Sequence, residues 1–329
     1  MFSATVSAPT TASPAPHRLA GIGWMVAAQA CFAGMNVCTR LGARALPWSE
    51  VASARFLVGA LLAWALARAR GSSLRITDWP NSWRRTIFGT LSAAGTFYAL
   101  ASHRIPLGDA ATLSATAPVL VALLSARLLG ERVGRGLSVA VFLAFLGVTA
   151  VVRPSFEAAA DVALIASAAA FFYALAMIWL RKIGPGESSE AVVFHFSAFA
   201  LVVFLLWSLP VWVTPDLPGL AFILATGVFG GAAQLAMTRA YAHDHAARIT
   251  AFAYLGIVFT HALAAIIFDE RPTLWQVGGS LLVITAGVAL TLGARRPETT
   301  SIEESGILRR TGEFATPSAT PSTEGERRA

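Results

Sequence analysis

The stretches LLGERVGRG (128–136) and IIFDERPTLW (266–275) indicate how this chain is built. Each one ends a long apolar run with a glutamate followed by an arginine, Glu131-Arg132 in the first and Glu270-Arg271 in the second. The two pairs lie 139 residues apart in a chain of 329. A boundary that recurs at such a distance predicts two related halves.

The composition predicts a membrane protein built only from helices. Hydrophobic residues make up 56% of the chain and charged residues 13%, and the mean hydropathy is +0.63. A soluble domain has about half apolar and about one-quarter charged residues. The charges lie between apolar runs of about 20 residues, the length that crosses a hydrocarbon core of about 30 Å. We therefore expect an all-α polytopic fold.

Ten spans follow from the apolar runs and the charged, proline or glycine residues that separate them. We predict them at 19–41, 51–68, 84–103, 109–128, 133–152, 161–181, 190–212, 217–242, 247–268 and 273–293. Residues 19–152 form the first half and 153–294 the second, between a disordered lead (1–18) and a disordered cytoplasmic tail (295–329). The run after Arg18 is expected to be a first helix and not a cleaved signal peptide.

The distribution of Lys and Arg predicts the orientation. Fifteen of these residues lie in loops on one side and five on the other. Cytoplasmic loops are enriched in Lys and Arg, so both termini are expected in the cytoplasm of a bacterial-type inner membrane. This placement also accounts for the net charge of +7 without nucleic acid as a partner.

A second pair of stretches strengthens the repeat. AQACFAGMNV (28–37) before SEVASARF (49–56) parallels AAAFFYALAM (168–177) before SEAVVFHF (189–196). Equivalent positions at a constant offset of 140 are Phe32 and Phe172, Glu50 and Glu190, Arg55 and His195, and Phe56 and Phe196. Since each half holds five spans, an odd number, the second half must be inverted. Inverted repeats are typical of carriers that work by alternating access around a midplane site.

These motifs also resemble a known family. RIPLGDAATLSATAPVLVALLSARLLGERVGRG (104–136), followed by GVTAVVRP (147–154), resembles the first EamA unit of the drug/metabolite transporter superfamily. AFAYLGIVFTHALAAIIFDERPTLWQVGGSLLVITAGV (251–288) resembles the second. The resemblance implies a ten-helix carrier of amino acids, nucleotide-like metabolites, vitamins or drugs. Because Ile257 stands where the first unit has Pro118, we expect the two halves to bend differently.

Polar side chains inside spans are costly and therefore candidates for function. The candidates for a substrate cavity are Asn36, Tyr98, Thr116, Tyr173, Gln234, Tyr254 and His261. Their alternative role is to bind helices together through hydrogen bonds. Pro118 removes a backbone hydrogen bond inside its span, which makes it a candidate hinge.

Charged and titratable residues suggest how transport could be coupled. No Asp or Glu lies in the middle of a predicted span, so proton coupling falls to His261 or His195, or is absent. Arg55 lies four residues inside its span and can extend to the interface, where it binds a substrate carboxylate or forms an anchoring pair with Glu50. Glu131 and Glu270 are candidates for a turn or gate at the span ends.

The sequence therefore favours a secondary transporter that exports a small, amino acid-like metabolite. The alternative is an uptake carrier for a vitamin or nucleoside-like cofactor, such as riboflavin or S-adenosylmethionine. A membrane enzyme is disfavoured because the chain lacks H-E-x-x-H, paired intramembrane aspartates and G-x-S-x-G. We expect no cofactor or metal, partners limited to substrate and membrane lipid, and a monomer or homodimer.

Overall fold

The computed structural model describes residues 16–128, 135–152, 156–183, 186–243 and 252–293. Within these ranges the described chain forms eleven α-helices and one short 3₁₀-helix. In the first half they are α1 (Pro16–Gly42), α2 (Trp48–Arg70), α3 (Trp79–Ala101), α4 (Leu107–Ser114), α5 (Ala117–Leu128) and α6 (Arg135–Val152). In the second half they are α7 (Phe156–Ile183), α8 (Ser189–Ser208), η2 (Leu209–Val211), α9 (Leu217–His243), α11 (Leu255–Phe268) and α12 (Leu274–Gly293).

These helices confirm the all-α fold with ten spans, because α4 and α5 together make the fourth span. Five described helices are long and apolar enough to cross a membrane, namely α1, α2, α7, α8 and α9. Large apolar side chains on the outer faces are exposed, including Leu164 at 72% and Ile266 at 79%. Such a surface suits hydrocarbon and not water.

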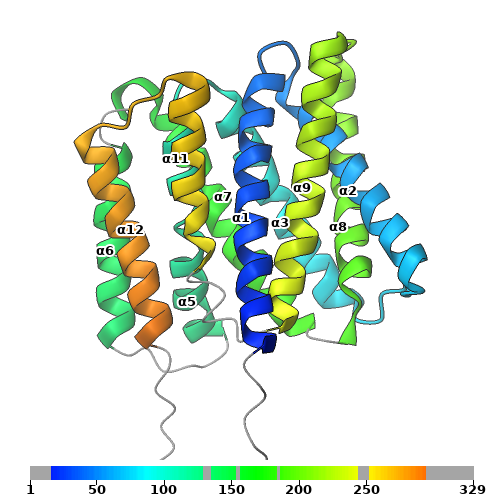
Figure 1. Cartoon of the computed structure of the whole chain (residues 1–329), viewed down its shortest axis with the longest axis horizontal. Coiled ribbons are helices and arrows are strands. Elements are labelled where there is room, and N and C mark those ends of the chain that lie inside the picture. Colours follow the sequence, from blue (N-terminus) through cyan, green and yellow to red (C-terminus); the bar gives the residue numbers. More distant parts are fainter. Residues whose placement is uncertain (1–15, 129–134, 153–155, 184–185, 244–251, 294–329) are drawn as a thin grey trace, which may run out of the picture. The chain divides into compact units, whose positions relative to one another are not determined.

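The helix packing is two-fold, as an inverted repeat requires. The equivalent helices α2 and α8 pack on each other, and so do α6 and α12. The pairing of α1 with α9 has its counterpart in the pairing of α7 with α3. Figure 1 shows α1 beside α9, and α12 beside α6. The repeats are therefore interleaved and not packed as separate five-helix blocks.

In each half, the fourth span is interrupted by a turn near the position of the candidate hinge. Residues 115 and 116 separate α4 from α5, just before Pro118. A proline ring clashes with the carbonyl of the residue four positions earlier, here Ser114, at which α4 ends. The second half is interrupted by a turn at Tyr254, the position equivalent to 115, although Ile257 replaces the proline. The interruption therefore occurs at equivalent positions in both halves, with a proline after it in the first half only.

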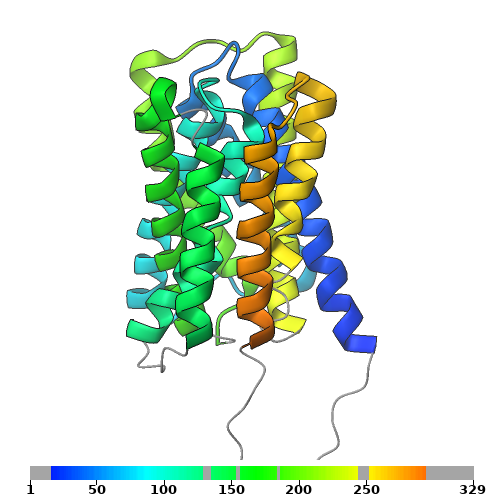
Figure 2. The same ribbon diagram turned by 90° about the vertical axis from the view of Figure 1, so that its left-hand side faces the viewer.

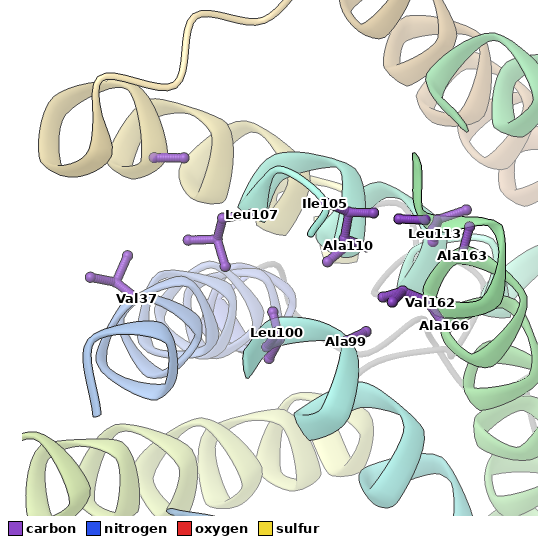
Figure 3. Packing of buried hydrophobic residues seen from close by; sticks show 12 residues of the cluster. Val37, Ala99, Leu100, Ile105, Leu107, Ala110, Leu113, Val162, Ala163 and Ala166 are labelled. Atoms are coloured by element: carbon purple, nitrogen blue, oxygen red, sulfur yellow. The ribbon is translucent and has the colours of Figure 1, made fainter. Parts of the chain in front are cut away.

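An apolar cluster lies near one of the two ends of the helical unit. α1 begins and α12 ends at the lower end of Figures 1 and 2, whereas α1 and α11 end at the upper end. Below the upper end, apolar side chains from five helices and one loop form a continuous cluster, which Figure 3 shows from close by. Its members include Leu100, Ile105 and Leu107, each with an exposed fraction of 2% or less. This cluster packs helices of both halves together near the upper end.

Two arginines that the charge count assigned to loops lie inside helices. Arg40 belongs to α1 and is 3% exposed, and Arg85 belongs to α3 and is 5% exposed. The predicted spans 19–41 and 84–103 already contain these two residues, so the structure contradicts only their inclusion in the loop count. Removing one arginine from each side leaves the excess of fifteen over five almost unchanged, so the expected orientation does not depend on them.

Candidate functional site

A partly buried ion pair connects the two halves at the upper end. Arg40 Nη1 donates to Glu270 Oε1 at 2.7 Å, and its remaining donors reach the carbonyls of Leu100 at 3.1 Å and Ile105 at 2.6 Å. Glu270 Oε2 accepts from the backbone N–H of Leu107 at 2.7 Å. We call this cluster the Arg40–Glu270 latch.

The latch is fixed on each side by local backbone structure. Glu270 follows Asp269, which ends α11 in the left-handed region with φ 52°. Leu107 begins α4, whose first N–H groups have no helical partner and so favour a carboxylate. The latch thus ties α1, α3, α4 and α11 together. The equivalent residue in the first half, Glu131, lies outside the described residues.

His261 on α11 lies between two hydroxyl groups from two other helices. Its Nε2 is 3.3 Å from Thr112 Oγ1 on α4 and 3.3 Å from Ser280 Oγ on α12. The two hydroxyl oxygens are 3.2 Å apart. The ring packs against Gly108, where an added Cβ would come within 2.0 Å of Nδ1. His261 therefore has partners on neighbouring helices, as the alternative structural role requires.

The other cavity candidates contact residues on different helices. Asn36 Nδ2 is 3.5 Å from Thr260 Oγ1, which links α1 to α11. The Tyr98 ring meets Trp48 edge to face at 6.1 Å. Tyr173 donates to the sulfur of Met237 at 3.5 Å, between α7 and α9.

Three further candidates lie near helix interruptions or within the packed interior. Thr116 donates to the carbonyl of Leu113 at 2.7 Å, inside the break between α4 and α5. Tyr254 lies at the interruption before α11 and is 2% exposed, and Gln234 on α9 is 7% exposed. Backbone atoms around Pro118 belong to the first turn of α5. The contacts given for these residues thus lie on several different helices.

Arg55 does not extend to the membrane interface. It lies seven residues inside α2 and is 4% exposed, with its guanidinium 4.1 Å from the Phe56 ring centroid. No ion pair joins it to Glu50 within the described chain. Glu50 accepts instead from the N–H of Val213 at 3.2 Å, just after α8. The anchoring pair considered from the sequence is thus not formed.

The repeat equivalent of Glu50 makes a related contact. Glu190, near the start of α8, forms an ion pair with Arg70 at the end of α2, at 3.1 Å. Each glutamate therefore reaches from the start of its own helix to the far end of the equivalent helix. These contacts fasten α2 and α8 to each other at both ends.

His195 lies against a hydroxyl and two indole rings. Its Nδ1 is 3.0 Å from Thr86 Oγ1 on α3, and its ring meets Trp83 at 5.0 Å and Trp79 at 5.4 Å, both nearly perpendicular. Arg85, the residue before Thr86, lies over the Phe196 ring at 3.9 Å. The α3–α8 contact thus holds both a candidate coupling group and a buried cation.

Sequence reasoning missed Arg85 because a charge near a span end normally turns toward water. The sequence signal that could have found it is the spacing of Arg85 and Gly89, which places a glycine one turn further along the same helix face. Within the described residues, no group of three or more His, Cys, Asp or Glu could hold a metal. Cys31 and Cys38 are free thiols.

Two inverted five-span halves with polar side chains buried between them define a membrane transport protein. The model of the EamA-like transporter family matches residues 19–153 and 162–293, one match for each half. The chain belongs to this family, and the resemblance to drug/metabolite transporters is confirmed.

Three relatives of the chain are named as exporters or transporters. The chain is 31% identical to the pseudopaline exporter of Pseudomonas aeruginosa, over 82% of this chain and 95% of that protein. It is 24% identical to the riboflavin transporter of Vibrio cholerae, over 82% and 92%. It is 23% identical to the S-adenosylmethionine uptake transporter of Rickettsia bellii, over 81% and 91%.

A solved crystal structure shares the fold. It aligns with a TM-score of 0.60 and 21% identity, and the match covers 86% of this chain and all of the other. The family and its relatives make transport the general activity of this chain.

Proposed function

We propose that the chain exports a small, amino acid-like organic metabolite across a bacterial inner membrane by alternating access. The observation that carries this proposal is the Arg40–Glu270 latch between the two inverted halves. It closes one end through an ion pair that joins helices from both repeats. An opening of this end must break the pair, as a gate in an alternating-access carrier does.

Export is favoured over uptake by the relative that is 31% identical, which is named as an exporter. The more distant relatives named as riboflavin and S-adenosylmethionine transporters, at 24% and 23%, support the alternative of vitamin or cofactor uptake. A membrane enzyme is not supported by any relative named above. Purified protein that hydrolysed a substrate without a gradient would revive that third function.

Direction and substrate class are tested together in everted inner-membrane vesicles that contain the full chain. An exporter accumulates its substrate inside such vesicles, so radiolabelled amino acids should enter faster than into vesicles lacking the chain. Riboflavin and S-adenosylmethionine should neither enter nor compete. Entry of either compound only into right-side-out vesicles would replace the proposal with the uptake alternative.

The orientation is tested separately with reporter fusions. We propose that both termini are cytoplasmic, so a C-terminal green fluorescent protein should fluoresce and a C-terminal alkaline phosphatase should be inactive. Active phosphatase at the C-terminus would contradict this orientation.

A further inference from the structure

A cluster of buried polar atoms on α2, α3 and α8 has no hydrogen-bond partner in the described structure. Its atoms are Nη1 of Arg55, Nε and Nη1 of Arg85, and Oγ of Ser197. The exposed fractions of these residues are 4%, 5% and 0%. Within the described residues, neither arginine forms an ion pair with a carboxylate. Two cations are thus buried at membrane depth without a counter-ion.

Two glycines pack closely against these atoms. A Cβ added at Gly59 would lie 3.3 Å from Ser197 Oγ and 3.7 Å from Arg55 Nη1. A Cβ added at Gly89 would lie 2.9 Å from Arg85 Nη1. The side chains of Arg55, Arg85 and Ser197 therefore occupy the space beside the glycine backbone, so a side chain at either glycine would crowd these polar atoms.

Aromatic rings compensate the two charges only in part. Arg55 lies 4.1 Å from the Phe56 centroid, Arg85 lies 3.9 Å from the Phe196 centroid, and the two rings are 5.2 Å apart. A cation–π contact offsets only part of the free energy that the burial of an ion costs. The positive charges of Arg55 and Arg85 also repel each other. An anion between them would remove both costs.

We propose that Arg55, Arg85 and Ser197 bind the acidic groups of the transported metabolite, which is a small organic anion with two carboxylates. A guanidinium offers paired N–H donors that match one carboxylate, so two guanidiniums match two carboxylates. The Ser197 hydroxyl supplies a further donor. This inference rests on the proposed function, because it takes the ligand to be the transported metabolite.

The first test measures binding to the purified full chain in detergent, without any transport. Glutarate carries two carboxylates, glutaramide is its uncharged diamide, and inorganic phosphate is a different anion of similar charge. Glutarate should raise the melting temperature saturably and glutaramide should not. Stabilisation by glutaramide to the same extent, or by phosphate alone, would overturn the carboxylate assignment.

Neutral substitutions identify the residues responsible. Arg55→Gln and Arg85→Gln should each weaken glutarate binding at least about tenfold, because each removes a charge-assisted contact. Arg44→Gln is the matched control: Arg44 also lies over a ring, that of Phe268 at 5.6 Å, but it is exposed and outside the cluster. Unchanged binding in both site variants would refute the proposal.

A third variant remains informative if the arginine variants do not fold. Ser197→Asp places a carboxylate beside Gly59 and the arginines, so it should raise the melting temperature of the ligand-free protein and abolish stabilisation by glutarate. Ser197→Asn has nearly the same shape without the charge and serves as its control. An Asp variant no more stable than the Asn variant would show that the arginines need no counter-ion.

These outcomes separate the two proposals. Glutarate binding without transport in vesicles would leave the anion site standing and remove the proposed function. Transport of neutral metabolites by a protein that does not bind glutarate would remove the anion site and leave the proposed function standing.

Discussion

Phe56 and Phe196, which occupy equivalent positions in the two halves, contact each other edge to face with ring centroids 5.2 Å apart. A residue that meets its own repeat equivalent lies at the pseudo-two-fold axis relating the halves. The rings also carry Arg55 and Arg85 on their faces. The axis of the repeat and the cluster of buried cations therefore coincide, as expected for a carrier with a central site.

The latch should contribute far more to stability than an exposed ion pair does. Arg40→Gln and Glu270→Gln should each destabilise the protein by about 3 kcal/mol, because each leaves a largely buried partner unpaired. The double variant should lose less unfolding free energy than the two single variants lose in total. A double-mutant cycle from thermal unfolding of the purified protein measures this coupling.

The control for the latch is the pair of Arg104 and Asp161, whose side chains are 48% and 54% exposed. Its coupling should lie between about 0 and 1 kcal/mol. Equal coupling energies for the two pairs would show that the latch is an ordinary surface contact.

Two adjacent glycines of α12 should respond differently to alanine. A Cβ at Gly279 would lie 2.5 Å from the carbonyl oxygen of Gly147 on α6, whereas a Cβ at Gly278 meets nothing within 4 Å. Gly279→Ala should therefore destabilise the protein by about 1–3 kcal/mol, because the added methyl group would push α6 and α12 apart. Gly278→Ala should leave the melting temperature unchanged or slightly higher. Similar losses for both variants would argue against close packing of these helices.

His261 can be tested as a coupling residue although it has hydroxyl partners. If it carries a proton during transport, His261→Ala should abolish accumulation driven by a pH gradient in proteoliposomes while substrate counterflow persists. His103→Asn is a suitable control, because His103 is exposed and asparagine tolerates its positive φ of 53°. Normal driven accumulation in the His261 variant would leave this residue a structural role only.

Glu187 should make one loop contact dependent on pH. Its carboxylate accepts from the hydroxyl and N–H of Thr77 and from the N–H of Asp78, and these bonds lower the pKa of Glu187 below the ordinary 4.5. Because the pKa of Glu187 is lower in the folded state than in the unfolded state, the ionised carboxylate stabilises the fold at pH values above its unfolded-state pKa. This stabilisation is lost as the pH falls through the folded-state pKa.

The measurement is the unfolding temperature of wild type and Glu187→Gln as the pH is lowered from 6 to 3. The difference between the two proteins should shrink toward pH 3. A constant difference between wild type and Glu187→Gln would rule out the carboxylate as its origin.

Much of the fold followed from the sequence because membrane spans obey simple local rules. Apolar runs of sufficient length predicted all ten spans, and the repeated motifs predicted two inverted halves. The interruption before Pro118 also followed from a local rule, the loss of a backbone hydrogen bond. The matching interruption at Tyr254 did not, since no proline marks it.

The candidate site was less accessible to sequence reasoning. His261 was singled out because a titratable group inside an apolar span is costly, yet its partners Thr112 and Ser280 come from other helices. Glu270 was recognised as a turn or gate, but its partner Arg40 lies 230 positions earlier in the chain. Arg85 was counted as a loop residue.

What the sequence alone determined is the number of spans, the inverted repeat and the family, because hydrophobic length and internal similarity are properties of the chain itself. Only the tertiary structure decided which charges meet. An arginine near a span end can turn toward water or inward, and its own neighbours in sequence do not distinguish the two. Arg85 turns inward because α8 presents Phe196 and Gly89 leaves room, and both conditions exist only after the helices have packed.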